Sequence, residues 1–339
     1  VDESTVRVDY SSNGATAVVP FSLSRKVAVS ISGAYVNAVS TALDGNDIVY
    51  SLSGKSSDGA FLQTGTYKCT VQLNGLELTS LQGAAIDIAN GKRIKMILAD
   101  GTENTLSDMA GGTQKACLYV KGHPEFEGNG TLNVTGNTSH AIASGEYMYV
   151  KSGNINVLAS ANDGIHAGQY FKIKSGSVVI RNAKGDGIQA DITKNATDEF
   201  NGQMIINGGK IDISSNSSDV KLLRCDSLMT ISGGTIVING NGDGIKGIAT
   251  DGNLVINKDN GDTNISVTVS GGVYTDPATS ETSKTRCIKV SGDFTITAGT
   301  LKANATGKKS ATIKVDGVSA KSAAASVTTN DGYVFDQTL

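Results

Sequence analysis

Short apolar runs recur along most of this chain, separated by small polar residues. Residues 145–167 and 168–190 follow one another directly as GEYMYVKSGNINVLASANDGIHA and GQYFKIKSGSVVIRNAKGDGIQA. Within each run, apolar and polar residues alternate over three to five positions, and Gly, Asn, Asp and Ser separate the runs. Alternation of this kind is typical of strands with one buried face, and those separators are typical of turns. The pattern predicts a repeat of two or three short strands.

One apolar residue of each repeat aligns down the chain, and we expect these residues to form one buried column. They are Ile86, Leu118, Ile142, Ile165, Ile188, Leu223, Ile248, Ile288 and Ile313. The common step is 23–25 residues, and the longer steps are attributed to polar insertions at 191–202 and about 256–268. A second register follows each SG or GG turn, as in Val178 and Ile180. Stacked coils of a parallel β-helix fit this repeat, because propeller blades are about 40–45 residues long and leucine-rich repeats need an LxxLxL pattern.

The repeat predicts an all-β chain with three parts. Residues 1–48 lack it and are predicted to form an N-terminal β cap, because the open end of a solenoid exposes its core. Residues 49–316 are predicted to form a parallel β-helix, right-handed by the crossover rule. Residues 317–339 contain few apolar side chains and are expected to close the other end.

Composition excludes some classes of protein. The net charge is −3 over 339 residues, whereas a nucleic-acid-binding protein is usually basic. No apolar run approaches the roughly 18 residues of a membrane-spanning helix. We therefore expect no nucleic-acid partner and no membrane-spanning segment. We also expect a monomer. Four cysteines form no CxxC pair, so they are interpreted as small core residues, with a disulfide as the less favoured alternative. They are Cys69, Cys117, Cys225 and Cys287.

Two acidic residues, Asp163 and Asp186, fall in register two positions before the aligned apolar column. Both begin DGI turns, and Asp243 begins a third one with an ambiguous alignment. Carboxylates on adjacent coils, about 4.8 Å apart, repel each other, and calcium, with its six to eight oxygen ligands, would relieve that repulsion. The alternative is that each Asp hydrogen-bonds the backbone of its own turn. Both interpretations stay open at this point.

In the following coils the same position is basic, as Lys221, Lys246 and Arg286. The next outward position carries His166, Gln189, Arg224, Lys289 and Lys314. The cations predict a strip for an anionic polymer such as a uronic-acid glycan. The alternative is a solvated face whose charge is balanced by three nearby acids, Asp226, Asp251 and Asp316.

Two tyrosines are predicted to point outward on neighbouring coils. Tyr147 and Tyr170 each precede a residue expected to point inward, Met148 and Phe171. Outward aromatic rings can stack on sugar rings, although cross-strand pairs in a sheet are the more common reason for them. The tyrosines are therefore candidate carbohydrate contacts.

Several of these segments resemble a family of bacterial carbohydrate-binding β-helix proteins. The resemblance rests on residues 67–108, on GEYMYVKSGNINV with its following NDGI, and on KGDGIQAD, and it covers about 45–315. It implies a secreted or surface protein that binds plant polysaccharides and calcium without established catalysis, with coils similar to those of calcium-dependent pectate lyases. DGI occurs only at Asp163, Asp186 and Asp243, so the resemblance implies calcium less strongly for the other coils.

Three functions are weighed. The first is a non-catalytic, extracellular or cell-surface protein of a bacterium that binds plant or acidic polysaccharides with calcium. Its carbohydrate contacts would be Lys221, Lys246, Arg286, Arg224, Tyr147 and Tyr170. The second is a calcium-dependent polysaccharide lyase with Lys221 as its base. The third is a structural adhesin or stalk. The chain starts at Val1 without a signal-like segment and is interpreted as trimmed, with a lipid anchor on the removed part as an alternative.

Overall fold

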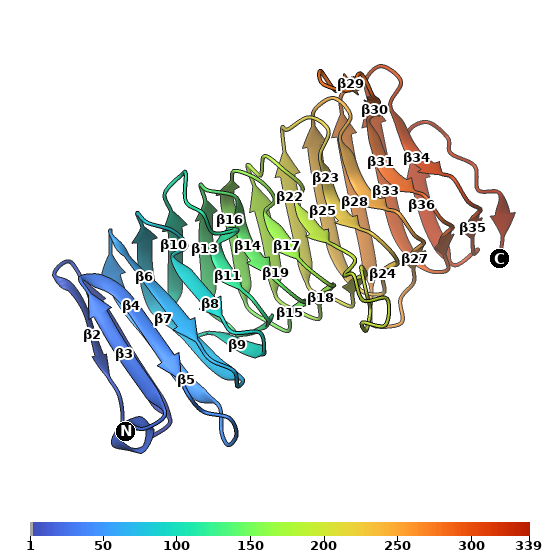
Figure 1. Ribbon diagram of the computed structural model, residues 1–339. Helices are drawn as coiled ribbons and strands as arrows, with labels where there is room; N and C mark the ends of the chain where they lie inside the picture. Colours follow the sequence, from blue (N-terminus) through green and yellow to red (C-terminus); the bar gives the residue numbers. More distant parts are fainter. Residues whose placement is uncertain (1–2) are drawn as a thin grey trace. The chain divides into compact units, whose positions relative to one another are not determined.

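The computed structural model describes residues 3–339, which consist almost entirely of β-strands and turns (Figure 1). The chain divides into two compact units, residues 1–161 (unit 1) and 162–339 (unit 2). Among the described residues the single helix is the 3-10 turn η1, Phe21–Leu23. No helix in residues 3–339 has the length and apolar character to cross a membrane.

Unit 1 is built from two β-sheets, blue to green in Figure 1. The first contains β1 Thr5–Ser11, β2 Gly14–Val18, β5 Ile48–Ser56, β7 Cys69–Ser80, β9 Arg93–Leu98, β10 Glu103–Asp108, β12 His123–Gly128, β13 Thr131–Gly136, β15 Met148–Val150 and β16 Asn154–Ser160. The second contains β3 Val27–Ser32, β4 Ala34–Ser40, β6 Gly59–Thr64, β8 Ile86–Ala89, β11 Ala116–Val120 and β14 His140–Ser144. Their inward side chains form the core between the sheets.

The strands before residue 49 combine antiparallel and parallel pairing. β1 pairs antiparallel with β2, and β3 pairs antiparallel with β4. β1 also pairs in parallel with β5, and β4 with β6. Strand β4 was not singled out from the sequence. Parallel stacking therefore already includes strands from the segment predicted to be a separate cap.

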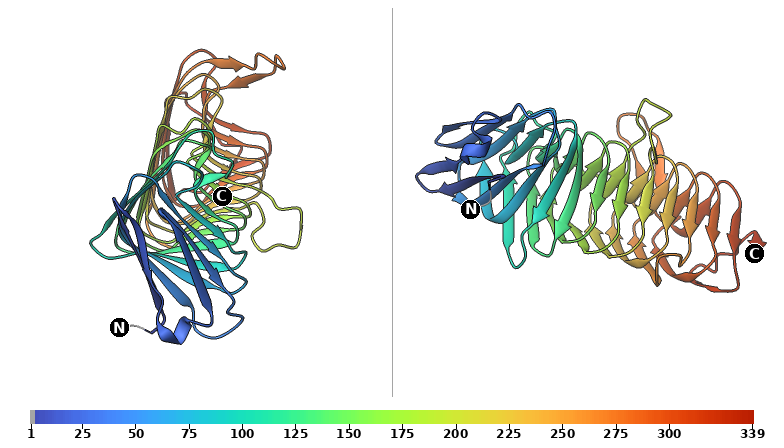
Figure 2. Two further views of the ribbon diagram at one scale, coloured as in Figure 1. Left: turned by 60° about the vertical axis from the view of Figure 1, so that its left-hand side comes forward. Right: turned by 90° about the horizontal axis from the view of Figure 1, so that it is seen from below.

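Unit 2 contains six three-stranded coils, which can be followed as rungs in the right-hand view of Figure 2. The first strands of the coils are β17 Ile165–Ala167, β20 Ile188–Ala190, β23 Lys221–Cys225, β26 Lys246–Thr250, β31 Arg286–Val290 and β34 Ala311–Val315. The second strands are β18 Phe171–Ile173, β21 Met204–Ile206, β24 Met229–Ile231, β27 Leu254–Ile256, β32 Phe294–Ile296 and β35 Ser319–Lys321. The third strands are β19 Ser177–Arg181, β22 Lys210–Ser215, β25 Gly234–Asn241, β28 Thr263–Ser270, β33 Gly299–Thr306 and β36 Ala325–Thr329.

Equivalent strands of successive coils in unit 2 pair in parallel, which is the arrangement of a β-helix. The predicted apolar column is present: Ile188 pairs with Leu223, Leu223 with Ile248, and Ile248 with Ile288. All four are 0% exposed. In unit 1, Leu118 likewise pairs with both Ile86 and Ile142. Burial of one large aliphatic side chain per coil therefore supports each rung, as the repeat predicted.

The SG and GG turns that mark the repeat require glycine. Gly209 and Gly234 have φ values of +77° and +93°, in the left-handed region that side chains disfavour. A Cβ atom on Gly234 would lie 2.6 Å from the carbonyl oxygen of Gly209 in the neighbouring coil. The turn therefore needs glycine both for its conformation and for the close approach of the coils.

The predicted insertion at about 256–268 is wrong in its placement. Residues 263–270 form β28, whose Ile265 and Val267 pair with Ile236 and Ile238 of β25 and fill the second apolar register. The long step between Ile248 and Ile288 instead contains a hairpin of β29 Val273–Thr275 and β30 Thr282–Lys284. Polar residues beside the strand concealed its apolar alternation, TNISVTVS.

The last residues continue the parallel pairing. β35 pairs with β32, β36 with β33, and the short strand β37, Gln337–Thr338, with β35. The ring of Phe335 lies 5.6 Å from that of Phe294, a fully buried core residue. An aromatic side chain therefore covers the end of the core of unit 2. The cysteines are all free and buried, as expected of core residues.

Candidate functional site

The register of unit 2 brings three predicted cations together. Lys221, Lys246 and Arg286 each begin their strand, and Lys221 pairs with Lys246 and Lys246 with Arg286. We call these three residues the cation ladder. Neighbouring strands in a sheet lie about 4.8 Å apart, so the ladder spans roughly 10 Å. The sequence alignment predicted this arrangement, and the strand register confirms it.

The three members of the ladder differ in their surroundings. The ammonium group of Lys221 forms no ion pair or hydrogen bond with any residue in 3–339, and its side chain is half-buried. The Lys246 side chain is 13% exposed and forms an ion pair of 3.5 Å with Asp219. The Arg286 guanidinium donates to the carbonyl oxygens of Thr285 at 2.7 Å and Lys309 at 2.8 Å. Lys221 is therefore the most available of the three.

The hairpin of β29 and β30 covers the middle of the ladder. The Lys246 ammonium donates to the hydroxyl of Ser283 in β30, and this hydroxyl also donates to the carbonyl oxygen of Gly244. Burial lowers the pKa of Lys246, although the Asp219 carboxylate acts in the opposite direction. The hairpin was not predicted from the sequence. Its signal was the unusually long step between Ile248 and Ile288.

The outward column beside the ladder is largely neutralised. Gln189 pairs with Arg224, and Lys289 pairs with Lys314, as the alignment predicted. Arg224 lies 3.5 Å from carboxylate oxygens of both Asp186 and Asp226. Lys314 lies 3.0 Å from Asp316, which also pairs with Lys289. For this column the balanced-charge interpretation describes the structure well, and Asp226 and Asp316 are two of the balancing acids that it named.

Asp163 and Asp186 both accept backbone hydrogen bonds from the next coil. Asp163 Oδ1 accepts the N–H of Asp186 at 2.8 Å, and Asp186 Oδ1 accepts the N–H of Lys221 at 2.7 Å. Both residues are buried, with exposures of 5% and 7%. The alternative to calcium that the sequence suggested was a hydrogen bond within each turn. The structure shows hydrogen bonds between coils, which tie each turn to its neighbour.

The second oxygen of each carboxylate faces a cationic side chain. Asp163 Oδ2 lies 3.1 Å from Nδ1 of His166, whose Nε2 lies 3.3 Å from Asp191. Burial opposes protonation of His166, but the hydrogen bonds to Asp163 and Asp191 outweigh it and raise the pKa to about 9. His166 is therefore protonated at neutral pH. Burial likewise raises the pKa of Asp186, and the N–H of Lys221 acts against that shift.

These contacts bear on whether the predicted calcium ligands fit an ion. A calcium ion at Asp163 and Asp186 would need oxygens that now face His166 and Arg224. Asp243 does not join the other two acids: it is exposed, and its Oδ1 accepts the N–H of Gly272 at 2.6 Å. Calcium at these turns therefore stays a prediction, and no step of the function proposed below depends on it.

The two predicted tyrosines lie in separate units and have different surroundings. The Tyr147 ring stacks on His123 with centroids 4.4 Å apart, and its hydroxyl donates to Glu125 Oε1 at 2.9 Å. Tyr170 is only 8% exposed, and its ring meets Phe200 edge-on at 5.5 Å. Tyr170 is therefore not exposed as a sugar contact would require, because the insertion at 191–202 places Phe200 over its ring.

Comparison with known proteins places the chain in a family. A family model described as "Carbohydrate-binding domain-containing protein" matches residues 37–326. A protein of that description from Acetivibrio thermocellus is 28% identical over an alignment of 106 positions that covers 28% of this chain. The match spans 37% of the length of that relative.

A solved structure, a gadolinium derivative of a polysaccharide lyase-like protein from C. thermocellum, resembles this chain with a TM-score of 0.62. The alignment covers 75% of this chain and 98% of that protein at 23% identity, and the TM-score shows that the two share a fold. The family model matches the sequence itself over most of the chain. This protein therefore belongs to the family of carbohydrate-binding domain-containing proteins.

Proposed function

We propose that this protein binds an acidic polysaccharide, such as a polyuronate, along the cation ladder of unit 2. One observation carries the proposal: Lys221, Lys246 and Arg286 lie in register on three neighbouring strands, and within residues 3–339 Asp219 is the only carboxylate in ion-pair contact with them. Family membership supports carbohydrate as the ligand, and the excess of positive charge supports an acidic one.

Repulsion along the ladder favours such a ligand. Two like charges one rung apart repel by about 0.9 kcal/mol in water, and more strongly where water is partly excluded. Lys246 is mostly covered, so its charge is screened less than that of an exposed lysine. A chain of uronates lying along the solenoid axis would bring carboxylates to successive rungs and relieve this repulsion. The geometry suits binding to a long polymer better than binding to a single sugar.

The location and chemistry of the protein follow from this proposal. A polymer of this kind occurs outside the cell, so we place the protein in the extracellular space or on the surface of a bacterium. Binding is proposed to occur without cleavage. The carbohydrate contacts would come from the cation ladder, with Arg224 beside it. Tyr147 in unit 1 remains a separate candidate contact.

The test compares polygalacturonate binding by the wild type and by the double variant Lys221→Ala/Lys246→Ala, using isothermal titration calorimetry. Removal of two of the three ladder cations is expected to weaken binding by roughly tenfold, from the magnitude of individual ion pairs. Lys174→Ala/Lys302→Ala is the matched control, because it removes two exposed charges from other faces of unit 2. Equal binding by all three proteins would refute the proposed site. No binding by the wild type would favour a structural stalk.

Cleavage by β-elimination is a second candidate function, favoured by one observation. Burial lowers the pKa of Lys246, which increases the fraction of neutral amine available as a base near neutral pH. Lys221, the base predicted from the sequence, is its neighbour on the ladder. Cleavage would form unsaturated products with ultraviolet absorbance. Lys246→Arg keeps the charge but removes the base, so it should abolish product formation while binding persists; absence of product from the wild type would exclude this function.

A further inference from the structure

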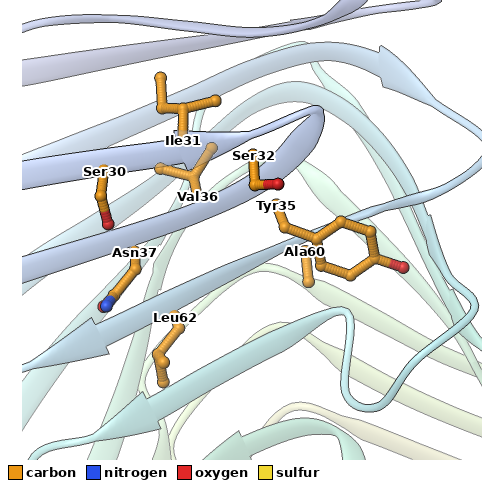
Figure 3. A pocket seen from close by; sticks show the side chains of 8 residues that line it. All are labelled: Ser30, Ile31, Ser32, Tyr35, Val36, Asn37, Ala60 and Leu62. Atoms are coloured by element: carbon orange, nitrogen blue, oxygen red, sulfur yellow. The ribbon is translucent and has the colours of Figure 1, made fainter.

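Unit 1 has two adjoining hollows on the outward face of β3, β4, β6 and β8, far in sequence from the cation ladder. The first has a volume of about 330 Å³ and is shown in Figure 3. The second has a volume of about 180 Å³ and reaches β8. The two share Tyr35, Ala60 and Leu62, so they form one groove across the strands, which we call the unit 1 groove. Its larger part lies within the size range of small-ligand sites.

Small outward side chains create the groove. On β4, Tyr35 pairs with Ser32 of β3 on one side and with Ala60 of β6 on the other. A large ring between two small side chains leaves space on both of its flanks. One position further along this face, Asn37 pairs with Leu62, which in turn pairs with Asp87 of β8. An apolar floor is therefore bordered by polar groups at both ends.

Two of these polar groups have an oxygen without a partner. Asn37 Oδ1 and Asp87 Oδ1 are buried and accept no hydrogen bond from residues 3–339. The other oxygen of Asp87 accepts from Gln114 Nε2 at 2.6 Å, so Oδ1 is the oxygen left without a donor. A buried acceptor without a donor is unfavourable, and a ligand hydroxyl that reached it after a small side-chain rotation would remove that penalty. Two acceptor oxygens beside the groove, on Asn37 and Asp87, therefore lack a hydrogen-bond donor that a ligand could supply.

The charge of the groove limits the class of ligand. Its lining contains no Lys or Arg, and its single charged side chain is Asp87. An anionic ligand would meet a carboxylate with no cation to offset it. The apolar floor, with Leu62 and Ala60, suits a ligand with C–H surfaces. Neutral sugars combine such surfaces with hydroxyl donors.

We propose that the unit 1 groove binds a neutral oligosaccharide, whose C–H faces pack on Ala60 and Leu62 and whose hydroxyls donate to Asn37 and Asp87. This site is separate from the cation ladder and selects against uronates. It rests on the proposed function only in taking carbohydrate as its ligand. The protein would then hold two chemically different glycan segments, one at each site.

The experiment measures binding of neutral gluco- and xylo-oligosaccharides, and of polygalacturonate, by calorimetry to the full chain. Ala60→Trp fills the groove without entering the core, because Ala60 points outward, and it should lower affinity for the neutral ligand at least tenfold. Asn37→Ala should weaken binding by about threefold to tenfold through loss of one hydrogen bond. Asp87→Asn removes the charge and should raise affinity for oligogalacturonate at this site, measured in the Lys221→Ala/Lys246→Ala background.

Lys221→Ala/Lys246→Ala alone is the control for site identity, and it should leave neutral-ligand binding unchanged. Thermal unfolding and polygalacturonate binding verify that each groove variant is folded. If a groove variant does not fold, the wild type still provides a test, because a neutral ligand should shift the NMR signals of the Leu62 methyls and the Asn37 side-chain amide. Unshifted signals, or a wild type that binds no neutral oligosaccharide, would refute the proposed binding site in the unit 1 groove.

The proposed site would also be refuted if neutral oligosaccharides still bound the Ala60→Trp variant, or if they no longer bound the Lys221→Ala/Lys246→Ala variant. The outcomes for the two sites are distinguishable. Failure of the proposed function appears as a lack of polygalacturonate binding by the wild type. Failure of the groove appears only with the neutral oligosaccharides.

Discussion

The carboxylate of Asp186 accepts the backbone N–H of Lys221 at 2.7 Å, so the first residue of the cation ladder is anchored by an acid one coil earlier. The same carboxylate faces Arg224 at 3.5 Å. Asp186 therefore both fixes the backbone of β23 and offsets part of the charge beside the ladder. It links the stability of two coils to the position of the candidate binding residues.

Replacement of Asp186 by Ala should destabilise the protein by about 1–3 kcal/mol, because the half-buried N–H of Lys221 loses its charged acceptor. Chemical denaturation measures the free energy of unfolding. Asp251→Ala is the control, since Asp251 is exposed and such substitutions usually change stability by less than about 0.5 kcal/mol. Equal effects of the two substitutions would show that the Asp186 hydrogen bond does not support the coil.

Replacement of Ile248 by Ala should cost about 2–5 kcal/mol, because it creates a cavity in the middle of the buried column. The same denaturation experiment measures this loss. Thr268→Ala on the exposed face of β28 is the control and should be close to neutral. A small loss at Ile248 would mean that the coils collapse readily around the missing side chain.

The pH at which the protein begins to unfold in acid should depend on Glu125 in unit 1. Burial raises the pKa of Glu125, but hydrogen bonds from Lys151 at 2.7 Å and Tyr147 at 2.9 Å outweigh it and hold the pKa below its usual value. A carboxylate with a lowered pKa in the folded state stabilises the protein above its unfolded pKa, near 4.3, and this contribution disappears as the pH falls through the folded pKa.

Lys151→Met removes the cation, so burial should then raise the pKa of Glu125 and move the onset of acid unfolding to higher pH. Denaturation curves between about pH 3 and pH 7 measure this shift. Lys55→Met is the control, because Lys55 pairs with Glu77 on the exposed surface. If Lys151→Met began to unfold at the same acidic pH as the wild type, the stabilising role assigned to the Lys151–Glu125 hydrogen bond would be contradicted.

The salt dependence of binding should distinguish the two proposed sites. Exposed charges are screened over about 10 Å at 0.1 M ionic strength and about 3 Å at 1 M. Binding of polygalacturonate at the cation ladder should therefore weaken several-fold across that range. Binding of a neutral oligosaccharide in the unit 1 groove should change little, since its ligand carries no charge. Salt-independent binding of polygalacturonate would contradict an ionic site at the ladder.

Calcium is expected to raise the melting temperature of chelator-treated protein in a concentration-dependent way if it binds the native state at Asp163 and Asp186. Differential scanning calorimetry with calcium and with EDTA measures this shift. The variant Asp163→Asn/Asp186→Asn should not respond. Absence of a shift in the wild type would mean that His166 and Arg224 balance these acids without a metal.

Features with a strict period were predictable from the sequence. The column of Ile188, Leu223 and Ile248 and the ladder of Lys221 and Lys246 follow directly from alignment of the repeats, because parallel strands transmit register from coil to coil. Features that depend on how non-repeating segments fold were not predictable. Alignment places Tyr170 on an outer position, but only the folded loop that carries Phe200 buries it.

The same limit explains why the unit 1 groove escaped the sequence analysis. A groove is defined by missing volume, and the small side chains of Ser32 and Ala60 gain meaning only when their strands pair with Tyr35. The Asp163–Asp186 pair illustrates the intermediate case. Alignment placed the two acids on neighbouring coils, but their hydrogen-bond donors became visible only in three dimensions.

The hairpin of β29 and β30 has a consequence for how proteins of this kind change over time. It adds a dozen residues between β28 and β31, yet Lys246 still pairs with Arg286 and Ile248 with Ile288. The register of each rung is set by its immediate neighbours. A loop can therefore lengthen, or a whole coil can be duplicated, without changes in the sequence or the pairing of the other coils. Duplication of residues 221–245 would add another rung with its own lysine. If a glycan lies along the cation ladder as proposed, the length that is bound can change in whole coils, independently of the loops that cover the ladder.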